Sequence, residues 1–303
     1  MPEPQKEGIA HFLTPEEMNK LSRLVLLSRY VVEGNLAGAH RSPMKGASSE
    51  FADHRQYIQG DDPKHLDWKL VARTDRYFIK RYEDETNLRV YFIVDCSNSM
   101  AYGYENITKY QYACHLTAAM GYVVVKIRDS VGLFLSSDKI ETKMPALNSF
   151  LHLNNLLKIM QHHTPGSTTQ LAKNLHQVAE SIGKRALIVI ISDLFDDPDA
   201  VNLALAHFRK YHHDVIVLHV LDPTEIDLSF KRGCEFEDME THETIIIDPR
   251  AMAKDYQAVF ENFLNTYRQS CSAMNIDYRI VKTTEPVDTF ARAYLEERRR
   301  LSK

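Results

Sequence analysis

Leu88–Met100 reads LRVYFIVDCSNSM, an apolar strand that runs directly into a loop of oxygen-bearing side chains. The run Val90–Val94 is rich in β-branched and aromatic residues, which is typical of a central strand covered on both faces of a parallel sheet. Asp95, Ser97 and Ser99 follow at alternate positions, so one carboxylate and two hydroxyls can face a common point. Such hard oxygen ligands suit Mg²⁺, Mn²⁺ or Ca²⁺ better than Zn²⁺. The stretch therefore predicts a buried strand that ends in a cation site.

The composition is that of an ordinary globular protein. The chain has 303 residues, 44% hydrophobic and 26% charged, enough for one large domain or for one domain with a smaller companion. A net charge of −4 gives no general attraction to nucleic acid or to an anionic membrane. No apolar run approaches the roughly 20 residues that span a bilayer, and the N-terminus lacks the pattern of a secretory signal. We expect a cytoplasmic protein that has no membrane span and binds no nucleic acid.

Cysteines and histidine pairs show no local metal-binding pattern. The cysteines are scattered without C-x-x-C spacing, which argues against a zinc site or a disulfide framework. We expect them to be reduced and structural. Each of the two histidine pairs lies at the C-terminus of an expected helix, where histidine is favourable without a metal. These residues are Cys96, Cys114, Cys234 and Cys271, and the pairs His162-His163 and His212-His213.

The first 87 residues read as a helix followed by a small folded segment. Residues 1–13 resemble a loose tail, and Thr14 then begins a helix as N-cap, with Glu17 three positions later as its capping-box partner. Helical spacing of apolar residues extends to Val32. The segment Glu50–Glu85 is highly charged but carries too many large apolar residues to be disordered.

Within that segment, Asp67–Arg73 predicts a short helix and Arg76–Tyr82 predicts a strand. Its basic and acidic residues are interleaved, so we interpret them as ion pairs rather than as a basic binding patch. We expect residues 1–87 to be a small appended α+β part, packed on residues 88–303 so that Trp68 is covered.

From residue 88 onwards, strands and helices alternate. This order predicts an α/β fold, a doubly wound and mostly parallel sheet with helices on both faces. The expected strands are Ser130–Leu135, Ile140–Lys143 at a paired edge, Arg185–Ile191, Asp214–Leu221 and Asp277–Val281, with a hairpin within Cys234–Ile247. The expected helices are Tyr110–Arg128, Asn148–Met160, one ending near Ile182, Asp199–Tyr211, Pro249–Met274 and Val287–Arg300.

Three separate loops should meet at one edge of this sheet. Asp95 and Asp193 each end an apolar strand, and Thr168 lies in the turn that precedes a helix. In open α/β sheets, ligands bind outside the carboxyl ends of the strands. The candidate metal residues are therefore Asp95, Ser97, Ser99, Thr168 and Asp193. For Thr168 and its neighbour Thr169, a simple helix N-cap is the open alternative.

These residues resemble a known site. The Asp95-x-Ser97-x-Ser99 pattern, the threonine after Gly166-Ser167 and the aspartate of Ser192-Asp193 are similar to the metal-ion-dependent adhesion site of von Willebrand factor A domains, over roughly residues 86–284. One departure is Ser167, where a second glycine is usual. The preceding segment, with Glu50-Phe51-Ala52-Asp53, Gly60-Asp61 and Asp67-Trp68, resembles the bacterial family catalogued as domain of unknown function 58.

The resemblance implies a binding protein rather than an enzyme. It implies Mg²⁺ or Mn²⁺ held mainly by hydroxyls, with a carboxylate from a partner completing the coordination. It also implies a chaperone-like or assembly role beside a MoxR-type AAA+ ATPase and a client protein. Many relatives carry transmembrane segments that this chain lacks.

Two alternatives stay open. A metal-dependent phosphoester hydrolase could use Asp95 or Asp193, although it would need a carboxylate nucleophile or a second metal about 3.5–4 Å away, with a general acid beside it. Position 97 is Ser where a D-x-D phosphatase has Asp, and no G-x-S-x-G elbow occurs. Alternatively, the metal site is vestigial and the fold binds partners through other surfaces.

Overall fold

The chain is described by a computed structural model in two units. One unit comprises Met1–Gly38 with Leu88–Lys303, and the other is Ala39–Asn87. The structure describes residues 7–22, 50–58, 64, 66–83, 88–103, 107–228, 230, 234–237, 239 and 243–301.

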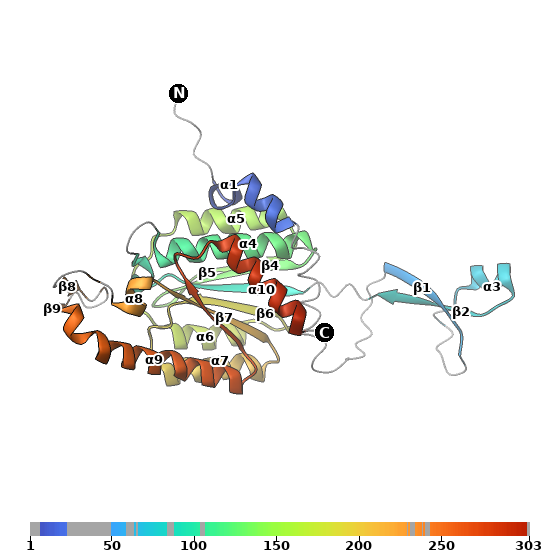
Figure 1. Ribbon diagram of the computed structural model, residues 1–303. Helices are drawn as coiled ribbons and strands as arrows, with labels where there is room; N and C mark the ends of the chain where they lie inside the picture. Colours follow the sequence, from blue (N-terminus) through green and yellow to red (C-terminus); the bar gives the residue numbers. More distant parts are fainter. Residues whose placement is uncertain are drawn as a thin grey trace, which may run out of the picture. The chain divides into compact units, whose positions relative to one another are not determined.

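A six-stranded sheet forms the centre of the larger unit (Figure 1). The strand order is β10-β7-β6-β3-β4-β5, and every neighbouring pair is parallel except β4 with β5. Numbered along the chain within this sheet, the order is 3-2-1-4-5-6, which is a doubly wound order. The strands are β3 (Arg89–Asp95), β4 (Ser130–Ser136), β5 (Ile140–Leu147), β6 (Leu187–Ser192), β7 (Asp214–Leu221) and β10 (Asp277–Lys282).

Apolar composition explains why β3 and β6 are central. Every residue of β6 is buried, and β3 is buried from Phe92 to its end. Strands covered on both faces need this continuous apolar character, because neither set of alternating side chains meets water. The antiparallel edge strand β5 alternates between half-buried and exposed residues instead. The predicted central strands and the paired edge are confirmed.

Helices cover both faces of the sheet. Figure 1 shows α4, α5 and α10 on one face and α6, α7 and α9 on the other. Each group packs on its own apolar cluster, so the expected two-sided α/β architecture is confirmed. The helices are α4 (Lys109–Lys126), α5 (Phe150–His162), α6 (Leu171–Ser181), α7 (Pro198–Lys210), α9 (Pro249–Ala273) and α10 (Val287–Leu301).

The N-terminal residues belong to this larger unit. Helix α1 (Ile9–Phe12) buries Phe12, and its first backbone N–H groups are bound from α5: Gly8 N donates to Gln161 Oε1 and Ile9 N to Asn154 Oδ1. The expectation of a loose tail is therefore wrong for residues 7–13, because an apolar anchor and two side-chain acceptors offset the entropy of ordering them.

Thr14 and Glu17 form the predicted capping box. Thr14 N donates to Glu17 Oε2 at 2.7 Å, and Glu17 N donates to Thr14 Oγ1 at 3.2 Å. Residues 15–22 are helical, and the predicted end of this helix near Val32 lies outside the described residues. The described residues 7–22 belong to the same unit as residues 88–303.

The smaller unit is a β-hairpin with one short helix. Strand β1 (Glu50–Gln56) pairs antiparallel with β2 (Phe78–Glu83), and α3 (Trp68–Thr74) lies between them in sequence. The Asp67 side chain caps α3 by accepting from two backbone N–H groups. Trp68 is 64% exposed, so this unit does not itself provide the expected cover. Among the described residues of this unit, two strands and one short helix form no second layer that could bury an indole.

Across the described parts of the chain, no helix is both long and apolar enough to cross a membrane.

Candidate metal site at the switch point of the sheet

The topology places Asp95 and Asp193 beside a natural crevice. From β3 the chain turns to β4 on one side, and from β6 it turns to β7 on the other. Strands β3 and β6 are neighbours, so the connections leave in opposite directions and open a crevice at their carboxyl ends. Asp95 is the last residue of β3, and Asp193 directly follows β6.

Asp95 is fixed and almost fully buried. Its side chain accepts from Ser97 N at 3.0 Å through Oδ1 and from Ser192 Oγ at 2.6 Å through Oδ2, and the residue is 1% exposed. Burial raises the pKa of Asp95 to about 6, and the negative charge of Asp193 acts in the same direction. The hydrogen bonds from Ser192 and Ser97 oppose this rise. Asp95 is thus a preorganised carboxylate that a cation would stabilise.

Ser97 and Ser99 present a pair of hydroxyls. The short 3₁₀ helix η2 (Asn98–Ala101) curls the chain so that Ser97 Oγ lies 3.1 Å from Ser99 Oγ. Adjacent ligands of an octahedral Mg²⁺ at about 2.1 Å lie about 3.0 Å apart. The spacing of the two hydroxyls therefore fits two adjacent positions of one hexacoordinate ion.

The loop that carries Thr168 is tied to this serine loop. Asn98 N donates to Ser167 O, and Gly166 N donates to Cys96 O, each at 3.0 Å. The side chain of Thr168 is exposed to solvent. Because the N-cap of α6 is Gln170, Thr168 does not serve as that cap. Thr168 therefore lies on a loop held against the serines, with its hydroxyl free to turn towards a bound ion.

Backbone conformation explains the usual glycine at position 167. Ser167 has a φ of 70°, in the left-handed region that glycine adopts without a steric cost. The serine keeps this conformation here, and both backbone hydrogen bonds to the serine loop are made. Serine in place of glycine at position 167 therefore adds backbone strain but does not change the course of the loop.

A buried lysine, which the sequence did not single out, lies at the centre of the site. The side chain of Lys109, the first residue of α4, is 0% exposed, and its Nζ donates to Asp193 Oδ2 at 2.7 Å and to Glu225 Oε1 at 2.5 Å. The ring of Phe195 lies 4.8 Å from the ammonium. Burial alone would lower the pKa of Lys109, but the two carboxylates outweigh it and raise the pKa.

Glu225 links the lysine to a second helix end. In the short helix α8 (Pro223–Asp227), Asp222 N donates to Glu225 Oε2 and Thr224 N donates to Asp222 Oδ1, forming a capping box. One oxygen of Glu225 thus caps the helix and the other accepts from Lys109. Burial raises the pKa of Glu225 even though the ammonium opposes this.

The local charge count favours a divalent cation. The carboxylates of Asp95, Asp193 and Glu225 against the ammonium of Lys109 leave a net charge of −2 when all four are ionised. Buried charge of one sign is costly unless it is compensated. One divalent ion bound by the serine hydroxyls would bring this group to neutrality, so the donor set and the charge both suit Mg²⁺ or Mn²⁺.

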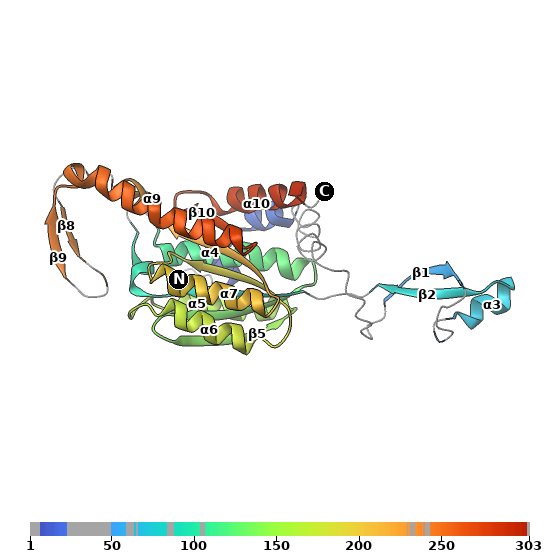
Figure 2. The ribbon, with the colours of Figure 1, turned by 90° about the horizontal axis from the view of Figure 1, so that it is seen from below.

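A hairpin from the far end of the chain reaches the same loop. Strands β8 (Cys234–Glu237) and β9 (Thr244–Ile247) form this hairpin, which Figure 2 shows beside the N-terminal end of α9. Asn98 Nδ2, from between the two serines, donates to Met239 O at 3.0 Å. The connection between β8 and β9 is therefore a direct neighbour of the candidate metal ligands.

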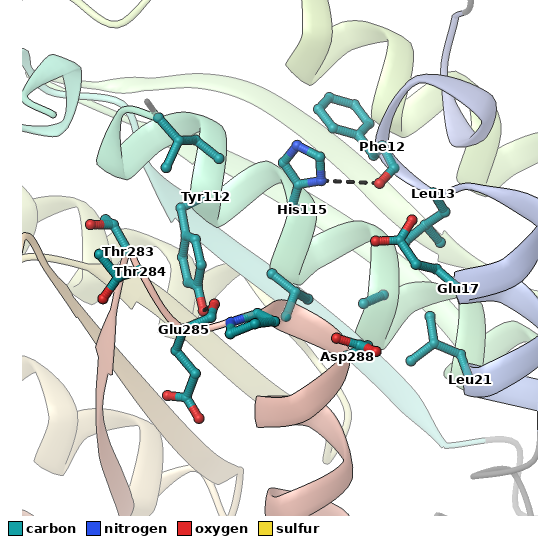
Figure 3. Close-up of a pocket in the computed structure, with 14 residues that line it drawn as sticks. Phe12, Leu13, Glu17, Leu21, Tyr112, His115, Thr283, Thr284, Glu285 and Asp288 are labelled. Carbon is teal, nitrogen blue, oxygen red and sulfur yellow. Dashed lines mark hydrogen bonds between the residues drawn. The ribbon is translucent and has the colours of Figure 1, made fainter. Parts of the chain in front are cut away.

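A separate cavity of about 250 Å³ lies between the N-terminal helices, α4 and the start of α10 (Figure 3). His115 and Tyr112 line it from α4, and His115 Nδ1 is 3.0 Å from Phe12 O. Glu17 and Asp288 add carboxylates to its wall. Its lining includes none of the predicted metal residues, so the strand-end site remains the candidate functional site.

Of the five predicted residues, the structure joins Asp95, Ser97 and Ser99 in one hydrogen-bonded network. Asp193 is coupled to Asp95 electrostatically and held by Lys109. Lys109 and Glu225 were missed, because a lysine after a capping threonine and a glutamate after Asp-Pro-Thr look like ordinary helix starts. The doubly wound sheet, with candidate ligands at its strand ends, is the architecture that the resemblance to von Willebrand factor A domains implies.

Comparison with known proteins places the chain in a family. Residues 53–263 match the family described as protein of unknown function DUF58, and the chain belongs to this family. Uncharacterized proteins of Mycobacterium bovis and Mycobacterium tuberculosis are each 25% identical over 230 residues, covering 75% of this chain and 72% of theirs.

Solved structures with a similar fold include an aerotolerance-related membrane protein from Bacteroides fragilis, 17% identical, with a TM-score of 0.46 over 71% of this chain and 99% of that chain. The VWA domain of SpRpn10 is 10% identical, with a TM-score of 0.37 over 68% of this chain and 93% of that chain.

Proposed function

We propose that this chain is a non-enzymatic adaptor that binds Mg²⁺ or Mn²⁺ at the strand-end site and grips an acidic side chain of a partner protein through the ion. The observation that carries the proposal is the pair of hydroxyls of Ser97 and Ser99, 3.1 Å apart, backed by buried carboxylates that remain one positive ion short of neutrality. The family resemblance adds the class of partner, a MoxR-type AAA+ ATPase and its client, and a role in assembly or chaperoning.

Each residue has a distinct task in this proposal. Ser97 and Ser99 bind the ion directly, and Thr168 reaches it from the exposed loop. Asp95 and Asp193 act through water, because their oxygens already accept hydrogen bonds from the protein. An ion held mainly by neutral hydroxyls keeps most of its positive charge, so it attracts a carboxylate from outside. The bound metal supplies that electrostatic attraction.

The burial of the two aspartates argues against hydrolysis. Asp95 and Asp193 are each 1% exposed, so neither carboxylate could approach the phosphorus of a phosphoester as a nucleophile. Lys109 holds Asp193 Oδ2 directly, which also removes it from attack. A general acid or base must come within hydrogen-bond reach of the reacting group. Among the candidate ligands, Thr168 is exposed and Ser99 is half-buried, whereas Ser97 is as buried as the two aspartates. The groups that an outside partner can reach are therefore hydroxyls without an accessible carboxylate beside them, which suits binding better than catalysis.

One observation favours a second reading, in which the fold binds partners without a metal. The ammonium of Lys109 already neutralises part of the acidic cluster, so the site can fold around an internal cation. In this reading, the loops around Ser97 and Thr168 still form the partner surface, but chelation does not change binding. The two readings therefore differ in one measurable property, the dependence of partner capture on a divalent ion.

Calorimetry with Mg²⁺ and Mn²⁺ tests the metal directly. Wild type should bind one ion, and Ser97→Ala/Ser99→Ala should lose this binding. Ser181→Ala is the matched control, since its hydroxyl bonds only within α6. Equal affinity in the double variant and wild type would refute the site.

Partner capture completes the test. A MoxR-type ATPase from the same organism should be retained by wild type with Mg²⁺ and lost with EDTA or with the double serine variant. Retention under all conditions would instead support metal-independent binding. A phosphatase assay run in parallel addresses the hydrolase alternative, because turnover that Asp95→Ala abolishes would overturn the adaptor proposal.

A further inference from the structure

A second group of ligating side chains lies on the other side of the Asp95 loop. Cys96, just after β3, Glu141 on β5 and His163, just after α5, each offer one ligand atom, and these atoms lie within 4.8 Å of one another. His163 Nδ1 is 3.7 Å from Glu141 Oε2. The three residues come from three separate elements, so only the fold brings them together.

The protein fixes the backbone at Cys96 and His163 and the carboxylate of Glu141. Cys96 is fully buried, and its backbone is fixed by bonds from Cys96 N to Ser136 O at 2.8 Å and from Gly166 N to Cys96 O. The Ser137 hydroxyl donates to Glu141 Oε1. His163 N donates to Ile159 O at the end of α5. The three residues are therefore carried by ordered elements that bring their ligand atoms within 4.8 Å of one another.

Hydrogen bonding does not account for the His163 ring. Its Nε2 is buried and has no hydrogen-bond partner, whereas buried polar atoms normally have one. The 3.7 Å between Nδ1 and Glu141 Oε2 is also too long for a hydrogen bond. Two ligands of one tetrahedral ion at about 2.0–2.1 Å lie roughly 3.4 Å apart. The separation between Nδ1 and Oε2 is thus close to that of two atoms bound to one ion, so Nδ1 is the nitrogen that would bind the metal. An ion at Nδ1 would not supply a partner for Nε2.

We propose that Cys96, Glu141 and His163 form a binding site for a transition metal ion of the Zn²⁺ type, distinct from the hydroxyl site. A thiolate, an imidazole and a carboxylate make a three-ligand set that zinc accepts with a water or an outside ligand in the fourth position. Thiolate and imidazole select such ions over Mg²⁺, which prefers oxygen ligands alone. The thiol of Cys96 gives up its proton to solvent when it binds the metal.

The accessibility of the cluster fits ion binding and excludes a thiol nucleophile. The side chain of Glu141 is 27% exposed and that of His163 is 17% exposed, so two of the three ligands are in contact with solvent. His163 also lines a cavity of about 230 Å³. Cys96 itself is 0% exposed, so its sulfur could not reach the carbonyl group of a substrate.

The location gives the site a consequence for the neighbouring loop. Cys96 lies between Asp95 and Ser97 in sequence, so an ion bound to its sulfur would anchor the loop that presents the serine hydroxyls. The expectation of inert cysteines rested on the missing C-x-x-C spacing, which excludes only sites built from one short segment. This site does not rest on the proposed adaptor function, since its ligands and its preferred ions differ.

Cobalt spectroscopy tests the site in the full chain. Chelator-treated protein is titrated with Co²⁺ while excess Mg²⁺ fills any hard oxygen site. Wild type should bind one Co²⁺ with a thiolate-to-cobalt absorption band in the near ultraviolet, and Zn²⁺ should displace it. No such band at a tenfold excess of Co²⁺ over protein would overturn the proposal.

Matched variants identify the ligands. Cys96→Ser should lose the thiolate band, and His163→Asn should weaken binding by at least about tenfold. Cys114→Ser, a buried cysteine of the same core, and His162→Asn, the exposed neighbour, should both behave as wild type. An undiminished band in Cys96→Ser would refute the site. Glu141→Gln, at a partly exposed position, should also weaken binding, and it decides the case if the cysteine variant does not fold.

Discussion

Replacing Lys109 with Met tests whether the buried ammonium balances the acidic cluster. Nζ lies 2.7 Å from Asp193 Oδ2 and 2.5 Å from Glu225 Oε1. At an effective dielectric constant of about 20, each contact corresponds to a gross attraction of roughly 6 kcal/mol. Desolvation of the ions offsets much of this attraction. Removing one partner from a buried ion pair typically costs about 3–5 kcal/mol, and we expect a loss of that size from Lys109→Met.

Divalent ions should partly rescue the variant. Without the ammonium, the net charge of the cluster becomes more negative by one, so the site should bind Mg²⁺ at least about tenfold more tightly. At saturating Mg²⁺ this adds about 1.4 kcal/mol to the stabilisation seen in wild type. The double variant Lys109→Met/Glu225→Gln should be less destabilised than Lys109→Met, because it removes one of the unpaired carboxylates.

Urea denaturation followed by circular dichroism, with EDTA and with Mg²⁺, measures these differences. Lys126→Met is the control, an exposed lysine at the other end of the same helix, and it should stay within about 0.5 kcal/mol of wild type. A Lys109→Met free energy of unfolding within about 1 kcal/mol of wild type in EDTA would refute the charge argument. If Mg²⁺ stabilised wild type and Lys109→Met equally, the charge of Lys109 would have no influence on metal binding.

Three further predictions follow from the geometry. Mg²⁺ affinity, measured by calorimetry, should fall as the pH drops through about 6, because protons compete at Asp95, and Asp95→Asn should flatten this dependence; an unchanged affinity at pH 5 would contradict it. His219 is buried and its pKa is lowered to about 4, so the folded state binds fewer protons than the unfolded state and loses stability as the pH falls from about 6.5 to 4. Relative to His219→Phe, wild type should lose about 3 kcal/mol of unfolding free energy over that range, and a parallel pH profile for both proteins would argue against it. Ser167→Gly should raise the free energy of unfolding by up to about 1 kcal/mol by relieving the positive φ, whereas the helical Ser181→Gly should lower it; a loss at position 167 would show that the side chain itself is needed.

Apolar patterning predicted the architecture well because the sheet is buried on both faces. The continuous runs in β3 and β6 could only be central strands, and their alternation with helices specified parallel, doubly wound pairing. The same rule predicts from the sequence alone that Asp95 and Asp193 lie at one edge of the sheet. The aspartates and serines at the strand ends can be recognised locally in the sequence. They come together because the carboxyl ends of parallel strands lie at the same edge of a sheet.

What the sequence could not provide are contacts between distant residues that carry no local pattern. Lys109 and Glu225 are separated by 116 positions, and each has a satisfactory local explanation as part of a helix start. The group of Cys96, Glu141 and His163 is hidden for the same reason. The expectation of a loose N-terminal tail failed for a simpler reason. The helix that contains Phe12 has four residues, too few to show a helical period in the sequence. The order of this segment is seen only in the structure, where Phe12 is buried and its helix packs against α4 and α5.

The bond from Asn98 to Met239 has a consequence for how such a protein could diversify. It sets the β8–β9 hairpin, with Ile245 60% exposed and Ile246 79% exposed, beside the loop that presents the hydroxyls. The ion would attract the carboxylate of a partner. The shape and the exposed apolar side chains of the hairpin would then determine which partner binds. Exchange of hairpin residues could then redirect the protein to another partner while the chemistry of attraction stayed the same. Affinity and choice of partner would thus be encoded in segments that lie about 140 residues apart and are joined by the hydrogen bond from Asn98 to Met239.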